Sequence, residues 1–252
     1  MLLPLDDVGE GPAVLLLHAG IGDRRMYADH LQPLADAGVR AIAVDLPGFG
    51  EARMPDEEDA PWLDVIDTLD QLGVERAVLV GNSFGGAVAL RVAAVAPERV
   101  SGLMLVSAPG EGIEPSPQLA AVWDAEASAL EDGDLDAAVA AIVDGWTLPS
   151  SSSELRELVA AMQRRAFETQ LAGPEAPEAR DPLEGGLGAI ANVAAPAIVA
   201  VGEHDMDDFR LAAEGFAAAL PDARLETIAG AGHLAPLEQP ERFRELVLSV
   251  VR

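Results

Sequence analysis

Short apolar runs recur along the chain, and stretches with helical periodicity separate them. The runs are rich in Val, Leu and Ile and are bounded by Gly, Pro or Asp, which is typical of strands. Because they are continuously apolar rather than alternating, they favour parallel strands that are covered on both faces. The predicted strands are Ala13–His18, Val39–Asp45, Ala77–Gly81, Gly102–Ser107, Pro196–Gly202 and Arg224–Ile228.

The stretches between these runs predict helices. Gly38 and Gly73 follow the first two, and Pro97 follows the third, as expected at helix ends. Alternation of strand and helix predicts right-handed crossovers and an α/β fold with a doubly wound, mostly parallel sheet. The predicted helices are Arg24–Ala37, Ala60–Leu72, Phe84–Ala96, Asp208–Leu220 and Pro240–Val251.

Residues 110–192 break this alternation. They contain helical stretches, a tail rich in Pro, Gly and acid, and no convincing strand. A segment of about 80 residues is far longer than one crossover needs. We therefore predict a helical cap over 110–192, inserted into a core made of residues 1–109 and 193–252. The helical stretches are Gln118–Leu130, Leu135–Gly145 and Glu154–Leu171.

Composition narrows the function classes. The 252 residues are 50% hydrophobic and carry a net charge of −27, with a pI near 4.2. This acidity argues against binding to nucleic acid or to an anionic membrane. No Lys and no Cys occur, so Schiff-base, pyridoxal-phosphate, P-loop and thiolate chemistry are excluded. We expect a soluble cytoplasmic protein without cofactor or metal, whose acidity reflects a solvated surface or adaptation to salt.

A serine nucleophile is indicated by the sequence Gly-Asn-Ser-Phe-Gly, residues 81–85. An apolar strand precedes it and an Ala-rich helix follows it, which is the context that a nucleophile elbow requires. A strand that turns sharply into a helix leaves the central Ser83 exposed and strained. Gly81 and Gly85 suit that turn because side chains at these positions would clash.

A serine hydroxyl needs a base, and the chain has four histidines. His233 lies in a Gly-rich loop directly after the last strand, where α/β active sites are built. His18 ends the first strand and is expected to support a loop. His30 is expected to be solvated on a surface helix, and His204 to pack beside the site. His233 is therefore the predicted base.

The predicted acid is Asp205, which follows the strand that ends at Gly202. It gives the chain order Ser, Asp, His that this arrangement of strands favours. Asp207 and Asp208 are rivals, but they suit the first turn of the next helix.

Attack on a carbonyl also needs donors for the developing oxyanion. The backbone N–H of Phe84, next to the nucleophile, is one candidate. The loop after the first strand supplies the second, from Gly20 or alternatively from Ile21.

The sequence resembles the α/β-hydrolase superfamily, and within it small bacterial esterases and enol-lactone hydrolases. The resemblance implies a helical cap where residues 110–192 fall. The family usually opens with two antiparallel strands, whereas only Leu2–Asp6 is available here, so we expect either a shortened sheet or an unusual first strand. The matching segments are His18-Ala19-Gly20, Asp45-Leu46-Pro47-Gly48-Phe49-Gly50, Gly81-Asn82-Ser83-Phe84-Gly85-Gly86, Gly202-Glu203-His204-Asp205 and Gly232-His233.

These residues predict a serine esterase or lactonase that acts through an acyl-enzyme. The alternatives are carbon–carbon bond hydrolysis or perhydrolysis by the same triad, or a ligand sensor that retains the pocket. Neutral ester or lactone substrates with small to medium acyl groups are favoured, because the negative field disfavours anions. The sequence does not predict an oligomeric state. The residues that we expect at the substrate are Ile21, Arg24, Tyr27, Trp123, Trp146 and Leu234.

Overall fold

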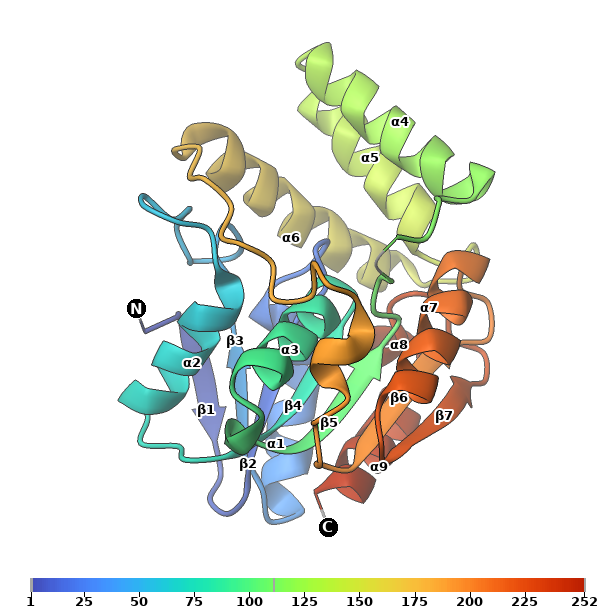
Figure 1. Cartoon of the computed structure of the whole chain (residues 1–252). Coiled ribbons are helices and arrows are strands. Elements are labelled where there is room, and N and C mark those ends of the chain that lie inside the picture. Colours follow the sequence, from blue (N-terminus) through green and yellow to red (C-terminus); the bar gives the residue numbers. More distant parts are fainter. Residues whose placement is uncertain (1, 111, 252) are drawn as a thin grey trace.

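The computed structural model describes residues 2–110 and 112–251 and contains a seven-stranded sheet in the order β1-β3-β2-β4-β5-β6-β7 (Figure 1). Only β1 runs antiparallel, so the predicted doubly wound, mostly parallel sheet is confirmed. Each predicted strand is present. The strands are β1 Leu5–Val8, β2 Ala13–Leu17, β3 Arg40–Val44, β4 Ala77–Asn82, β5 Val100–Val106, β6 Ala197–Gly202 and β7 Ala223–Ile228.

In the described part of the chain, one antiparallel strand precedes the parallel ones. It pairs with β3, with Leu5 opposite Val44 and Val8 opposite Ala41, and forms one edge of the sheet. Strand β7 forms the other edge and is partly exposed, unlike the buried strands between them.

Helices cover both faces of the sheet. One face carries α2, α3 and α7, and the other carries α1 and α9 (Figure 1). The predicted helices are all present, the first as a 3-10 turn followed by α1, while the short α8 lies in a region for which no helix was predicted. The bounds are η1 Arg24–Tyr27, α1 Ala28–Asp36, α2 Pro61–Gln71, α3 Phe84–Val95, η2 Pro97–Arg99, α7 Asp207–Ala219, α8 Ala235–Glu238 and α9 Pro240–Val250.

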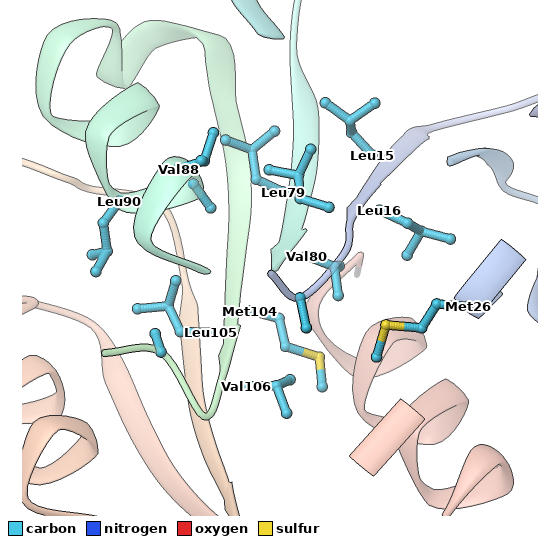
Figure 2. Packing of buried hydrophobic residues seen from close by; sticks show 14 of the residues in the cluster. Leu15, Leu16, Met26, Leu79, Val80, Val88, Leu90, Met104, Leu105 and Val106 are labelled. Carbon is cyan, nitrogen blue, oxygen red and sulfur yellow. The ribbon is translucent and has the colours of Figure 1, made fainter. Parts of the chain in front are cut away.

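The central strands are buried because their side chains alternate between two helical layers. Figure 2 shows Leu79 and Leu105 on the side of Val88 of α3, and Val80 and Met104 on the opposite side. All of these residues are at most 2% exposed. A sheet covered on both faces needs apolar residues at successive positions, which explains the continuous runs in the sequence.

Between β5 and β6 the chain forms three helices beyond the carboxyl ends of the strands and then a 3-10 helix that packs against α3 and α7, and we call this whole segment the helical insertion (Figure 1). In the described residues, this segment contributes no strand to the sheet. Within the same residues, no helix is long and apolar enough to span a membrane. The insertion contains α4 Pro117–Glu131, α5 Leu135–Trp146, α6 Ser153–Ala172 and η3 Leu187–Ile190.

Candidate active site

Ser83 occupies a sharp turn between β4 and α3. Its backbone has φ 51° and ψ −116°, a conformation that costs free energy for a residue with a side chain. A Cβ at Gly81 would overlap the Gly85 carbonyl, and a Cβ at Gly85 would overlap the Leu17 carbonyl. The two glycines therefore allow the turn, and Ser83 remains partly exposed at the edge of the sheet.

His233 and Asp205 meet beside this turn, on loops that follow β7 and β6. His233 Nδ1 lies 3.2 Å from each carboxylate oxygen of Asp205. The two residues are 5% and 8% exposed, so solvent competes little for this contact. The loops are joined by the backbone N–H of His204, which donates to the carbonyl of Ala231 at 2.8 Å.

The histidine loop is tied to the serine turn through Asn82. Its Nδ2 donates to the carbonyl of His233 and to that of Val106, both at 3.1 Å. The Ser83 N–H donates to the same Val106 carbonyl at 2.8 Å. Within the described residues, Ser83 and His233 share no hydrogen bond.

The loop after β2 approaches the start of α3. The Gly85 N–H donates to the His18 carbonyl at 3.0 Å, and a Cβ at Gly20 would lie 3.5 Å from the Phe84 Cβ. Across the described ranges, the N–H groups of Gly20 and Ile21 donate no backbone hydrogen bond. This edge of the sheet therefore offers backbone donors beside Ser83.

His18 supports that loop, as its position after the first strand suggested. Its Nδ1–H donates to the Ala19 carbonyl at 2.8 Å, and its Nε2 accepts from the Leu46 N–H at 2.9 Å. Burial lowers the pKa of His18, so the ring stays neutral and Nε2 remains an acceptor.

The expected solvation of His30 is wrong. Its side chain is 1% exposed, and its Nε2–H donates to the Pro236 carbonyl at 3.0 Å. Helix α1 carries it against α8, an element that was not predicted. His204 adjoins Asp205, and its side chain is 54% exposed.

The two rival carboxylates occupy the first turn of α7, as their spacing suggested. Asp208 Oδ1 accepts the Ser116 N–H at 2.7 Å and so anchors the start of α4. Asp207 lies 3.4 Å from Arg210, one turn along the helix.

Arg24 is not placed to hold a substrate carboxylate. Its guanidinium pairs with Asp6, Asp45 and Glu51, and Asp45 is fully buried. The chain's own carboxylates therefore use the donors that a ligand would need.

Tyr27 is buried beneath the loop, although the sequence predicted it at the substrate. It is 0% exposed, its hydroxyl donates to the Leu17 carbonyl at 2.9 Å, and its ring stacks on Phe243. The 3-10 turn that precedes α1 directs Tyr27 beneath the loop rather than toward solvent.

Among the other residues expected at the substrate, Trp146 is the one that contacts the histidine ring. The two ring centroids are 4.4 Å apart. Leu234 follows His233 and Ile21 follows Gly20, and both side chains are buried. Trp123 lies on α4 and is 48% exposed.

Sequence reasoning missed Phe209 and Glu238. The Phe209 ring lies 4.3 Å from that of His233, and Glu238 Oε2 accepts the Gly232 N–H at 2.7 Å. Burial raises the pKa of Glu238. In the sequence, Phe209 is one apolar position of a predicted helix, and Glu238 ends a helix of only four residues. Neither residue belongs to a sequence pattern that would place it beside His233. Across residues 2–110 and 112–251, no cluster of His, Cys, Asp or Glu could hold a metal ion.

The sequence model of the alpha/beta hydrolase family matches residues 14–246. The 2-hydroxymuconate semialdehyde hydrolase of Pseudomonas putida is 29% identical over 263 residues, which cover 96% of this chain and 88% of that protein. A thermophilic esterase from Thermogutta terrifontis superposes with a TM-score of 0.81 at 26% identity, covering 98% of this chain and 92% of the esterase.

A stronger but shorter match is the 2-hydroxy-6-oxo-6-phenylhexa-2,4-dienoate hydrolase of Comamonas testosteroni. It is 40% identical over 116 residues, which are 43% of this chain and 40% of that protein. The chain thus matches about two fifths of the length of this relative.

Proposed function

Because the chain belongs to the alpha/beta hydrolase family, we propose that it is a serine hydrolase that cleaves a carboxylic ester or lactone. Ser83 Oγ attacks the carbonyl carbon while His233 Nε2 takes the hydroxyl proton. Asp205 accepts the Nδ1–H and stabilises the imidazolium. The observation that carries this proposal is the buried Asp205–His233 pair, which Asn82 ties to the serine turn.

The N–H groups of Phe84 and Gly20 are proposed to bind the oxyanion of the tetrahedral intermediate. When that intermediate collapses, the bond to the alcohol oxygen breaks and His233 returns its proton to the leaving group. Water then attacks the acyl-enzyme with His233 again as base, which releases the acid and restores the serine.

The proposed substrate is a small, neutral ester or lactone. Ile21 and Leu234, which follow Gly20 and His233 in the sequence, are proposed to border the substrate with apolar side chains, and the exposed Trp123 on α4 to lie farther out. A net charge of −27 slows the approach of anions.

The test is a panel of p-nitrophenyl esters and lactones with the wild type and Ser83→Ala. We expect Ser83→Ala to lower kcat by at least about 10⁴-fold. Asp205→Asn should lower kcat by less, and Ser128→Ala, an exposed serine on α4, should behave as the wild type. Full activity of Ser83→Ala would refute the mechanism.

A second candidate is carbon–carbon bond hydrolysis, which the relatives favour. A 2-hydroxymuconate semialdehyde contains no ester, so a hydrolase that acts on it must break a carbon–carbon bond. Including this compound in the panel separates the two reactions: a kcat/KM for it above that for every ester would favour the second candidate.

A further inference from the structure

The His233 ring contacts two aromatic rings that come from different parts of the chain and that also contact each other. Its ring centroid is 4.4 Å from that of Trp146 and 4.3 Å from that of Phe209, with interplanar angles of 44° and 54°. Phe209 is in the first turn of α7, next to the sheet, whereas Trp146 is the last residue of α5. The helical insertion therefore packs directly on the imidazole.

The residues that follow Trp146 touch the histidine loop as well. A Cβ at Gly232 would lie 2.9 Å from Leu148 Cδ2, so Leu148 packs against the loop backbone. Between them, Thr147 Oγ1 accepts a hydrogen bond from Arg156 Nη1 of α6 at 2.7 Å. This hydrogen bond links the end of α5 to α6.

Asp205 alone does not define the plane of the imidazole. Its two oxygens lie at the same distance from His233 Nδ1, 3.2 Å, which is long for a charge-assisted hydrogen bond. The imidazole also turns about a torsion with a broad energy profile. The two tilted aromatic rings, which also contact each other with centroids 5.8 Å apart, occupy space into which the imidazole would otherwise turn.

We propose that Trp146 is a positioning residue for the general base: with Phe209 it holds the His233 ring in the plane that serves both Asp205 and Ser83. The helical insertion then completes the catalytic machinery as well as bordering the substrate. This proposal rests on the serine hydrolase mechanism above. Because His233 acts in the formation and in the hydrolysis of the acyl-enzyme, displacing its ring slows both steps and leaves substrate binding unchanged.

Two variants of Trp146 test whether the flat aromatic ring is needed or only a large apolar side chain. Trp146→Phe keeps an aromatic ring, and Trp146→Leu puts an aliphatic side chain of more similar size to Phe in its place, so the two variants differ mainly in the flat ring. With the best p-nitrophenyl ester of the panel, we expect Trp146→Leu to lower kcat by about 10- to 100-fold and to change KM by less than about twofold. Trp146→Phe should restore kcat to within about threefold of the wild type. Pre-steady-state kinetics should show that acylation and deacylation slow together in Trp146→Leu.

Val139→Ala is the matched control, because Val139 is 5% exposed on the same helix and lies about two turns from Trp146. It should lower the Tm of the protein without lowering kcat. A rise in KM at unchanged kcat in Trp146→Leu would overturn the proposal and make Trp146 a substrate contact. Equal kcat in the Leu and Phe variants would also overturn it, since volume alone would then suffice.

Measuring Ser83→Ala in the same assay distinguishes a failure of the role proposed for Trp146 from a failure of the serine hydrolase mechanism. If Ser83→Ala is inactive and Trp146→Leu has normal kcat, the role of Trp146 is wrong and the serine hydrolase stands. If Ser83→Ala retains activity, the serine mechanism itself is wrong.

Discussion

At the scale of single residues, the serine turn depends on two backbones meeting where a side chain would not fit. Gly85 illustrates this, because a Cβ there would overlap the carbonyl carbon and oxygen of Leu17, which are parts of β2 and cannot rotate away. The turn therefore requires α3 to start in direct contact with the neighbouring strand.

We predict that Gly85→Ala separates α3 from β2 and lowers the free energy of unfolding by about 3 kcal/mol. The activity should fall further than this loss explains, because Ser83 moves with the turn. Urea denaturation and ester hydrolysis measure the two effects. Gly185→Ala is the control, since a Cβ at Gly185 meets nothing within 4 Å. Equal stability of the two variants would contradict the prediction.

His30 makes stability depend on pH. Burial lowers its pKa to about 4, with the Pro236 carbonyl and Asp29 opposing this effect and Arg244 adding to it. The ordinary pKa is about 6.5, so the unfolded chain binds the proton first as pH falls. Neutral His30 therefore favours the fold above pH 6.5, and this contribution is lost between pH 6.5 and about 4.

We predict that His30→Gln reduces the loss of stability over this pH range by roughly 3 kcal/mol relative to the wild type. The glutamine can still donate to Pro236 but does not titrate. Urea denaturation at pH 7.5 and 4.5 measures the difference, and His204→Gln, at an exposed position, should match the wild type. A His30→Gln protein with an unchanged pH dependence would show that this histidine does not govern it.

Residue identity was predictable where chemistry fixes a local pattern. The glycines around Ser83 and the acid and histidine after strand ends are such patterns. The positions of Arg24 and Tyr27 were not, because a side chain's direction depends on partners far away in sequence. Asp6 and Glu51 form ion pairs with the Arg24 guanidinium, and no local sequence pattern predicts these pairs.

At the scale of elements, buried Asp45 connects two loops near the site. It accepts the Arg24 N–H and the Glu51 N–H at 2.8 Å each, and the Arg24 guanidinium compensates its charge. The loop after β2, which carries Gly20, is thereby held against the loop after β3.

We predict that Arg24→Met leaves Asp45 as a buried, uncompensated carboxylate and lowers stability by about 3 kcal/mol. The effect should appear as a lower Tm and a lower kcat for every ester, with no selective loss for anionic substrates. Arg180→Met removes an arginine that is 89% exposed and should change neither quantity. A selective rise in KM for carboxylate-bearing esters would contradict the prediction and show that Arg24 binds the substrate carboxylate.

Elements were more predictable than contacts. Every predicted strand and helix is present, and most of them bury a regular apolar pattern, although α4 and β7 each bury a single residue. The exceptions are instructive: α8 has four residues, too few to show a period, and it supplies both the partner of His30 and the carboxylate of Glu238. Short connecting elements thus contribute to the site without a recognisable pattern in the sequence.

At the scale of the whole molecule, the order of the strands brings distant segments together. The loops that carry Ser83, Asp205 and His233 follow β4, β6 and β7, whose carboxyl ends lie along one edge of the sheet. That convergence follows from a parallel sheet and was predictable. The packing of α5 on His233 was not, because it depends on how the helical insertion sits on the sheet (Figure 1).

The charge of the molecule sets its response to salt. Forty-three acidic residues face 16 arginines, so the exposed carboxylates repel one another across the surface. Screening shortens this repulsion from a range of about 10 Å at 0.1 M salt to about 3 Å at 1 M. We therefore predict that the Tm rises steadily between low salt and 1 M KCl. Replacing exposed Asp56, Glu57 and Glu58 by amides should raise the Tm at low salt and make the rise smaller, because fewer charges remain to be screened. A Tm independent of KCl in both proteins would show that charge repulsion does not limit the stability of this fold.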